Sequence, residues 1–145
     1  MSTWILVANA SRAKILTTDN LRVGKLDIMR EFAHPESRKK GLELAADKQG
    51  SYRTDEDGHG SYSSKSDPKE VEAERFALEL VNELKSGLGH NQFGELVIVA
   101  SAHFYGLLKK HFQPSADLKI IHVSKDYTQC DVLDLHEKIK KEIFI

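Results

Sequence analysis

The sequence predicts an α/β fold of the ribonuclease-H-like type, in which helices cover the faces of one mixed five-stranded sheet. Two observations lead to this prediction. Three strand-like segments stand together before residue 34, and two nearly continuous apolar strands alternate with helical patterns after residue 67. Strands joined by short turns pair antiparallel, whereas strands joined through helices pair parallel. One sheet that holds both kinds of pairing has the element order β-β-β-α-β-α-β-α.

The first three strands are expected at residues 3–9, 12–19 and 24–33. The first of these, TWILVAN, is an almost unbroken apolar run, which is typical of a strand covered on both faces. Asp19-Asn20 is a turn signal after the second strand. The third segment alternates apolar and charged residues, which indicates a strand with one wetter face.

A long helix is predicted to start at Asp67. Asp67 suits the N-cap, Pro68 suits the first helical position, and Glu70 completes a capping-box arrangement. Apolar residues then recur at helical spacing as far as Gly87, which lies just beyond the expected end. Residues 34–45 favour a short additional helix.

The second half of the chain predicts two more strands and two more helices. Buried strands are expected at 95–101 and 117–125, with a short helix at 102–112 between them. Thr128 and Asp131 form a capping-box pattern, which predicts that the last helix begins at Thr128.

Length, charge and cysteine content restrict the class of protein. The 145 residues are expected to form a single domain, 1–145. Lysine and arginine number 21 against 22 acidic residues, so the net charge of −1 provides no general field for attracting nucleic acid. The single cysteine, Cys130, is typical of a reducing compartment. The apolar run at residues 4–8 is too short for a secretory signal or a membrane helix, so we expect a cytoplasmic protein with no membrane contact.

A polar loop at residues 46–67 has no place in the predicted core. From residue 47 it contains no aliphatic side chain, but many glycines and serines and charges of both signs. Loops longer than about 12–15 residues usually bind a partner, act as lids or are disordered. Basic residues there could contact phosphates or acidic groups, tyrosines could stack, and glycines could let the backbone approach closely. The candidate loop residues are Arg38, Lys48, Gly50, Tyr52, Arg53, Gly58, His59, Gly60 and Tyr62.

A second candidate site lies where the parallel strands end. In open α/β sheets, ligands collect beyond the carboxyl ends of the strands, near the point where the strand order switches. Polar residues stand at each of these ends, and we expect them to be neighbours. They are Asn9, Arg12, Ser101, His103, Lys125 and Asp126.

Metal and nucleophile chemistry is disfavoured by the pattern. A two-metal nuclease needs clustered carboxylates, and the first strand contains no Asp or Glu. His103 and His111 lie eight residues apart on one predicted helix, roughly 12 Å along its axis, which is too far for one zinc ion. Cys130 is expected in the first helical turn, where the dipole favours a thiolate, but no base stands near it in sequence. We therefore expect no metal, no cofactor and no catalytic residue.

A set of residues spread over nearly the whole chain carries a family resemblance. They are Trp4, Ala8-Asn9, Ala13-Lys14, Asp47, Gly50, Phe76-Ala77, Leu80, Leu84, Ala100, Gly106-Leu107-Leu108-Lys109 and Lys125-Asp126-Tyr127-Thr128. In this order and spacing they resemble the bacterial host-attachment family, "protein required for attachment to host cells". That family is similar to the central domain of archaeal and eukaryotic peptide-chain release factors, which implies a ribonuclease-H-like fold. In release factors the equivalent loop enters the ribosomal peptidyl-transferase centre, where its Gly-Gly-Gln tip assists peptidyl-tRNA hydrolysis.

The chain departs from the release-factor pattern at this tip. Its loop offers Gln49-Gly50 and Gly58-His59-Gly60, but no Gly-Gly-Gln. The resemblance therefore implies contact with ribosome or tRNA without hydrolysis. The leading hypothesis is a cytoplasmic, non-enzymatic binding protein that uses the 47–66 loop and affects attachment to host cells indirectly.

Two alternatives stay open on the sequence. One is a hydrolase of a tRNA-linked or other ester, with His59 or His103 as the base. The other is a protein-interaction module whose polar loop is disordered or mediates self-association.

Overall fold

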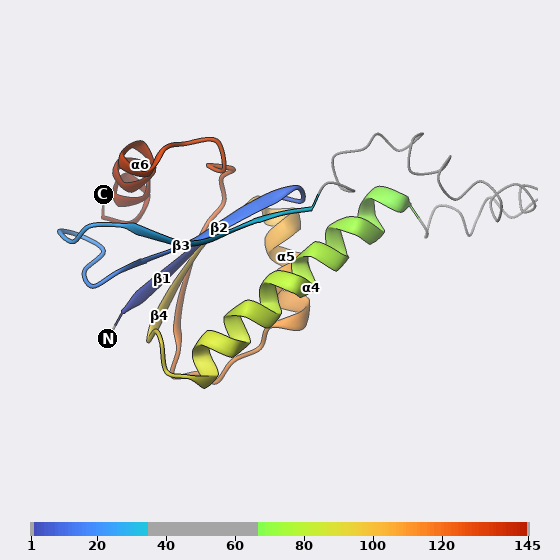
Figure 1. Cartoon of the computed structure of the whole chain (residues 1–145), viewed down its shortest axis with the longest axis horizontal. Helices are drawn as coiled ribbons and strands as arrows, with labels where there is room; N and C mark the ends of the chain where they lie inside the picture. The colour runs from blue at the N-terminus through green and yellow to red at the C-terminus, as the bar shows by residue number, and fades with distance from the viewer. Residues whose placement is uncertain (1, 35–66, 145) are drawn as a thin grey trace, which may run out of the picture.

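The computed structural model describes residues 2–34 and 67–144, which form a five-stranded sheet with helices on both faces (Figure 1). The order of elements is β-β-β-α-β-α-β-α, as predicted. The strands are β1 (Thr3–Ala8), β2 (Arg12–Thr18), β3 (Asp27–Ala33), β4 (Glu95–Val99) and β5 (Lys119–Val123). The helices are α4 (Pro68–Gly89), α5 (Ala102–His111) and α6 (Val132–Phe144). The polar loop before Asp67 and the short helix expected after His34 lie outside the described residues.

The strand order is β3-β2-β1-β4-β5. β2 pairs antiparallel with both β1 and β3, whereas β1, β4 and β5 run parallel. This order, with one reversal of direction at β2, confirms the predicted ribonuclease-H-like architecture.

The apolar first strand is buried on both faces because it stands at the centre of the sheet. All six residues of β1 are buried. Successive side chains of a strand point to opposite faces. Trp4 and Leu6 accordingly join the core beneath α4 and α5, while Ile5 and Val7 join the core beneath α6.

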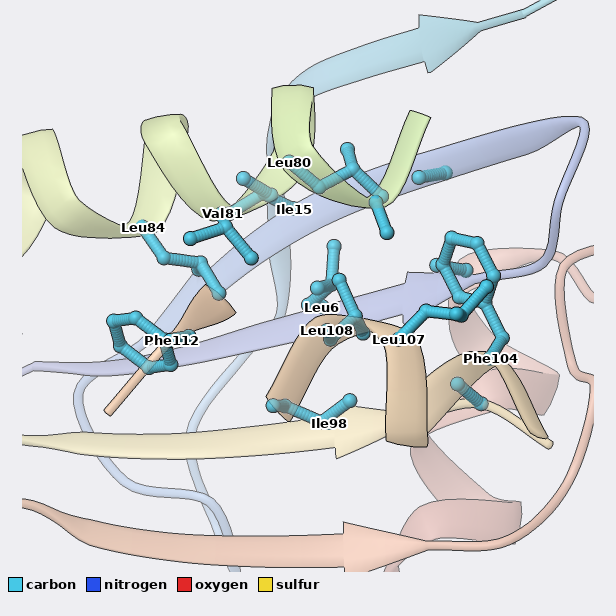
Figure 2. Packing of buried hydrophobic residues seen from close by; sticks show 14 of the residues in the cluster. Leu6, Ile15, Leu80, Val81, Leu84, Ile98, Phe104, Leu107, Leu108 and Phe112 are labelled. Atoms are coloured by element: carbon cyan, nitrogen blue, oxygen red, sulfur yellow. The ribbon is translucent and has the colours of Figure 1, made fainter. Parts of the chain in front are cut away.

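The face covered by α4 and α5 holds the larger core. Figure 2 shows Leu80, Val81 and Leu84 of α4 directed toward the strand side chains Leu6 and Ile15. The inward residues of α5 complete this cluster; they are Phe104, Leu107 and Leu108.

Gly87 lies inside α4 and not beyond its end, which corrects the expected boundary. A Cβ atom at this position would lie 2.3 Å from the indole of Trp4. That indole also stacks on Phe93, with ring centroids 4.5 Å apart. The glycine therefore lets the helix approach the tryptophan, and the helix continues to Gly89 with His90 as its C-cap.

Two elements start three or more residues later than predicted, and the remaining ends differ by two residues or fewer. β3 begins at Asp27 because residues 20–24 form a turn, in which the Gly24 N–H donates to the Asn20 carbonyl at 2.7 Å. α6 begins at Val132, and the side chain of Asp131 accepts the Asp134 N–H at 2.8 Å. The capping box expected to begin at Thr128 is therefore wrong.

Candidate functional site

The carboxyl ends of β1, β4 and β5 lie at one edge of the sheet because these strands run parallel. β2 begins and β3 ends at the same edge, since β2 runs in the opposite direction. We call this side of the molecule the carboxyl edge. It contains the strand-end residues predicted to form a site.

Asn9 connects the two halves of the chain at the carboxyl edge. Its Oδ1 accepts the N–H groups of Ser11 and Arg12 at 2.8 and 2.9 Å, which fixes the turn between β1 and β2. Its Nδ2 donates to Asp126 Oδ2 and to Thr128 Oγ1, both at 3.1 Å. The predicted proximity of Asn9 and Asp126 is therefore present in the structure.

The Asp126 carboxyl group is held in its ionised form. Burial alone would raise its pKa, but hydrogen bonds outweigh this effect and lower the pKa below the ordinary value. These bonds come from the Thr128 hydroxyl, the Asn9 amide and the Thr128 N–H, and the charge of Arg12 adds to them. The Thr128 hydroxyl donates to Asp126 Oδ1 at 2.7 Å.

A hollow of about 410 Å³ lies beside this network. We call it the β2 hollow. Arg12 and Lys14 stand two residues apart on β2 and therefore point to the same face of the sheet. Glu31 of β3 is paired with Lys14 in the strand register. The complete lining is Val7, Arg12, Ala13, Lys14, Glu31, Phe32, Ala33 and Thr128.

Lys14 extends from the sheet to the connection before α6. Its Nζ donates to the Cys130 carbonyl at 3.1 Å. The position of Cys130 before the helix corrects the expectation of a dipole-stabilised thiolate. Burial raises the pKa of the Cys130 thiol, and the Asp134 carboxylate adds to this effect through a hydrogen bond and its charge. The raised pKa favours the protonated thiol and so lowers its nucleophilicity.

Ser101 and His103 lie near the carboxyl edge but do not join the Asn9–Asp126 network. The Ser101 hydroxyl accepts the Phe104 N–H at 3.2 Å and so caps α5. His103 Nε2 lies 3.0 Å from Glu70 Oε1 on α4. Lys125 is exposed after β5, and its N–H donates to the Val123 carbonyl at 3.0 Å.

His34 holds the end of β3 against α4. Its Nε2 lies 2.8 Å from Glu72 Oε1, and its ring stacks on Phe76. Its backbone N–H donates to the Ser11 carbonyl at 2.8 Å. Glu72 is only 4% exposed and also accepts from Arg75 at 2.9 Å. The burial of Glu72 was not foreseen, although its position among apolar residues of the helical pattern was a usable signal.

Lys14, Glu31 and Thr128 were also absent from the predicted site. Lys14 could have been found, because a lysine two residues after Arg12 in a strand shares its face. Glu31 and Thr128 depend on strand pairing and on the long-range contact with Asn9, which carry no local signal.

The predicted loop residues lie outside the described residues, so their part in a site stays a prediction. They are Arg38, Lys48, Gly50, Tyr52, Arg53, Gly58, His59, Gly60 and Tyr62. Among residues 2–34 and 67–144, no three His, Cys, Asp or Glu side chains stand where they could hold a metal ion. In the same part of the chain, no helix has the length and apolar character required to cross a membrane.

Comparison with known proteins gives one family. The family described as "Protein required for attachment to host cells" matches residues 4–139, nearly the whole chain. No curated protein matches the chain. Except for Thr3, the match covers all five strands, and it covers most of α6. It therefore includes the carboxyl edge, the β2 hollow and both helices of the larger core. The chain therefore belongs to the family of proteins required for attachment to host cells.

Proposed function

We propose that the protein is a non-enzymatic, cytoplasmic binding protein whose partner is the ribosome or tRNA, and that it affects attachment to host cells indirectly. The contact surface consists of the carboxyl edge together with the 47–66 segment. One observation carries this proposal: β3 ends and α4 begins on the side of the sheet where Arg12 and Lys125 lie.

The two points of departure are His34 and Asp67. His34 is fixed on Glu72, and Glu72 follows Asp67 by five residues, roughly 7.5 Å along a helix axis. Figure 1 shows the end of β3 and the start of α4 on the same side of the molecule. The lysines and arginines of a segment that starts and ends here would add to the positive charges of the edge.

The charges at these positions suit a phosphate backbone. The residues between His34 and Asp67 include the basic residues Arg38, Lys39, Lys40, Lys48 and Arg53. They also include the acidic run Asp55-Glu56-Asp57, which opposes a polyanion, so the contact would depend on the basic positions and not on net charge. Arg12 forms no ion pair with any described residue, and Lys125 is exposed. Phosphate contacts of this kind provide affinity without sequence specificity and weaken as salt concentration rises.

The resemblance to release-factor central domains makes translation machinery the preferred source of this polyanion. The absence of a Gly-Gly-Gln sequence in the chain favours binding over hydrolysis. Residues 2–34 and 67–144 contain no helix that could cross a membrane, which is compatible with an indirect effect on attachment.

Sedimentation of a bacterial lysate through sucrose gradients at low and high salt tests the proposal. The tagged protein should migrate with ribosomal particles or tRNA at low salt and leave them at high salt. A version lacking residues 48–65 should stay at the top of both gradients. Absence of the intact protein from every ribosomal and tRNA fraction at low salt would contradict the proposal.

Two double variants test whether binding depends on the positive charges of the carboxyl edge or on the overall charge of the protein. Arg12→Ala with Lys125→Ala removes two positive charges at the edge. Lys25→Ala with Lys85→Ala removes two exposed positive charges at the opposite end of the sheet, and serves as the matched control. Only the first pair should weaken migration with ribosomal particles. Equal weakening by both pairs would show that the edge is not the contact surface.

One observation favours the hydrolase as a second candidate. Glu70 lies 3.0 Å from His103 Nε2, and a carboxylate in this position orients a histidine that acts as a base. An aminoacyl-tRNA or p-nitrophenyl ester incubated with the protein tests this candidate. Turnover that is lost in His103→Ala and reduced in Glu70→Gln would support it. An intact ester after long incubation would contradict it.

A further inference from the structure

We propose that the β2 hollow binds one ribonucleotide through its 5′-phosphate and its 2′,3′-diol. This inference rests on the proposed function, because it names the part of an RNA that the carboxyl edge recognises. The same chemistry occurs in a free ribonucleoside 5′-monophosphate and at the 3′-terminal nucleotide of an RNA. The volume of about 410 Å³ lies within the range of small-ligand pockets, about 300–1,000 Å³.

Arg12 and Lys14 provide the phosphate-binding side of the hollow. Two residues along a strand are about 7 Å apart, so a single phosphate fits between their side chains. Lys14 uses one donor on the Cys130 carbonyl and has two others, since an ammonium group carries three. Neither cation forms an ion pair with a carboxylate of the described residues.

Glu31 provides the hydrogen-bond acceptors for the ribose hydroxyls. It lies across from Lys14 in the register of β2 and β3, lines the hollow, and forms no hydrogen bond or ion pair with another side chain of the described residues. An ionised carboxylate only accepts hydrogen bonds, and its two oxygens can accept both hydroxyls of a ribose diol. Opposite residues of an antiparallel pair have Cα atoms about 4.5–5.5 Å apart. This spacing keeps the diol and the phosphate of one nucleotide within reach of Glu31 and Lys14.

The charges of the site exclude a simple anion as the preferred ligand. The two positive groups, Arg12 and Lys14, are balanced by Glu31 and by Asp126, whose carboxylate is already bonded to Asn9 and Thr128. Inorganic phosphate would bring its negative charge against Glu31 and has no uncharged vicinal diol to donate to both carboxylate oxygens. A ligand that carries a phosphate and hydroxyl donors together satisfies both sides of the hollow.

The test is a calorimetric titration of the purified full chain with each of three ligands: adenosine 5′-monophosphate, its 2′-deoxy analogue and inorganic phosphate. The ribonucleotide should bind at least about tenfold more tightly than the deoxynucleotide, since a hydrogen bond to a charged group contributes about 1.5–3 kcal/mol. Inorganic phosphate should bind more weakly than both. Glu31→Gln should reduce the affinity for the ribonucleotide to that for the deoxynucleotide, and Arg12→Gln should weaken both. Glu79→Gln, an exposed carboxylate on α4, is the matched control and should change neither.

A short oligoribonucleotide identifies the source of the ligand. An oligomer with a free 3′-terminal diol should bind, and the same oligomer with a 3′-phosphate should bind about tenfold more weakly. Equal affinity of the wild type for ribose and deoxyribose forms, or binding of neither AMP nor the oligomer, would overturn the inference. Each variant is checked for its thermal unfolding temperature, so that loss of fold is not mistaken for loss of binding. The titrations contain no ribosomes, so they can fail while the gradient experiment succeeds, and the reverse.

Discussion

The two faces of the sheet differ in how completely helices cover them. Within residues 2–34 and 67–144, α4 and α5 cover one face and close a cluster of nineteen buried residues, whereas α6 covers the other and closes a cluster of ten. On the second face, the part of the sheet formed by β2 and β3 keeps polar residues and the β2 hollow. The difference shows that the number of covering helices decides where charged side chains can collect on this fold.

This division has a consequence for mutational effects. Residues beneath α4 and α5 should contribute most to the free energy of unfolding, and the charged residues of the β2 hollow should affect it little. The following predictions test that division, from the largest expected effect to the smallest.

Leu80→Ala should lower the free energy of unfolding by about 2–5 kcal/mol, because Leu80 is fully buried beneath α4 and its truncation leaves a cavity. Arg12→Ala, on the face with the hollow, should change it by no more than about 0.5 kcal/mol. Urea unfolding followed by circular dichroism measures both. Comparable losses in the two variants would break the proposed division between the faces.

Gly87→Ala should lower the free energy of unfolding by about 1–3 kcal/mol, because the new methyl group would meet the Trp4 indole. Gly106→Ala is the matched control, since no atom lies within 4 Å of a Cβ at this helical position. That change should raise stability by about 0.5–1 kcal/mol through helix propensity. Thermal unfolding of both variants measures the difference. An unchanged stability of Gly87→Ala would indicate loose packing on the face covered by α4 and α5.

Asp126→Asn should destabilise the protein at pH 7 by at most about 1 kcal/mol, because the carboxylate is exposed and its hydrogen bonds are few. The folded-state pKa of Asp126 is lowered from 3.8, so its contribution is present above that value and is lost as pH falls through the folded-state pKa. The stability gap between wild type and variant should therefore close below about pH 4. Unfolding temperatures at pH 7, 5 and 3 provide the measurement. A difference in stability that widens in acid would contradict this prediction.

Cys130 should react more slowly with iodoacetamide at pH 8 in the folded protein than in urea, since burial and Asp134 raise the pKa of its thiol above 9.0. Asp134→Asn should restore part of the rate by removing the carboxylate's hydrogen bond and charge. Mass spectrometry of the alkylated protein measures both rates. A folded rate equal to the rate in urea would mean that the connection before α6 opens easily, and that the second face is less covered than the structure shows.

The buried strands and the helices were predictable because their signals are local. β1 and β4 are apolar runs, and the Asp67–Pro68 helix start carries its own capping signal, which the structure confirms. The start of α6 was not predictable, because Thr128 bonds to Asn9, 119 residues away along the chain, and not to the helix. A contact between residues so far apart in the chain produces no periodic pattern in the sequence.

The candidate site was predictable only in part for the same reason. Because ligands collect at the carboxyl ends of parallel strands, Asn9, Arg12 and Asp126 were predicted to lie in one region, and the structure places them there. Their role in binding stays a prediction. It also included Ser101 and His103, whose side chains bond to α5 and α4. Family membership was predicted from residues spread along the chain and is confirmed, whereas the kinship with release factors stays a prediction.

The contact between His34 and Glu72 has a consequence for the evolution of the chain. It keeps the two ends of the intervening sequence close together through contacts among the described residues alone. The entropy of closing such a connection grows only with the logarithm of its length, about 0.6 kcal/mol for each doubling. Relatives can therefore lengthen, shorten or exchange these residues at little cost in folding free energy. Under the proposed function, recognition and stability then depend on separate parts of the chain, so that either can be altered without the other.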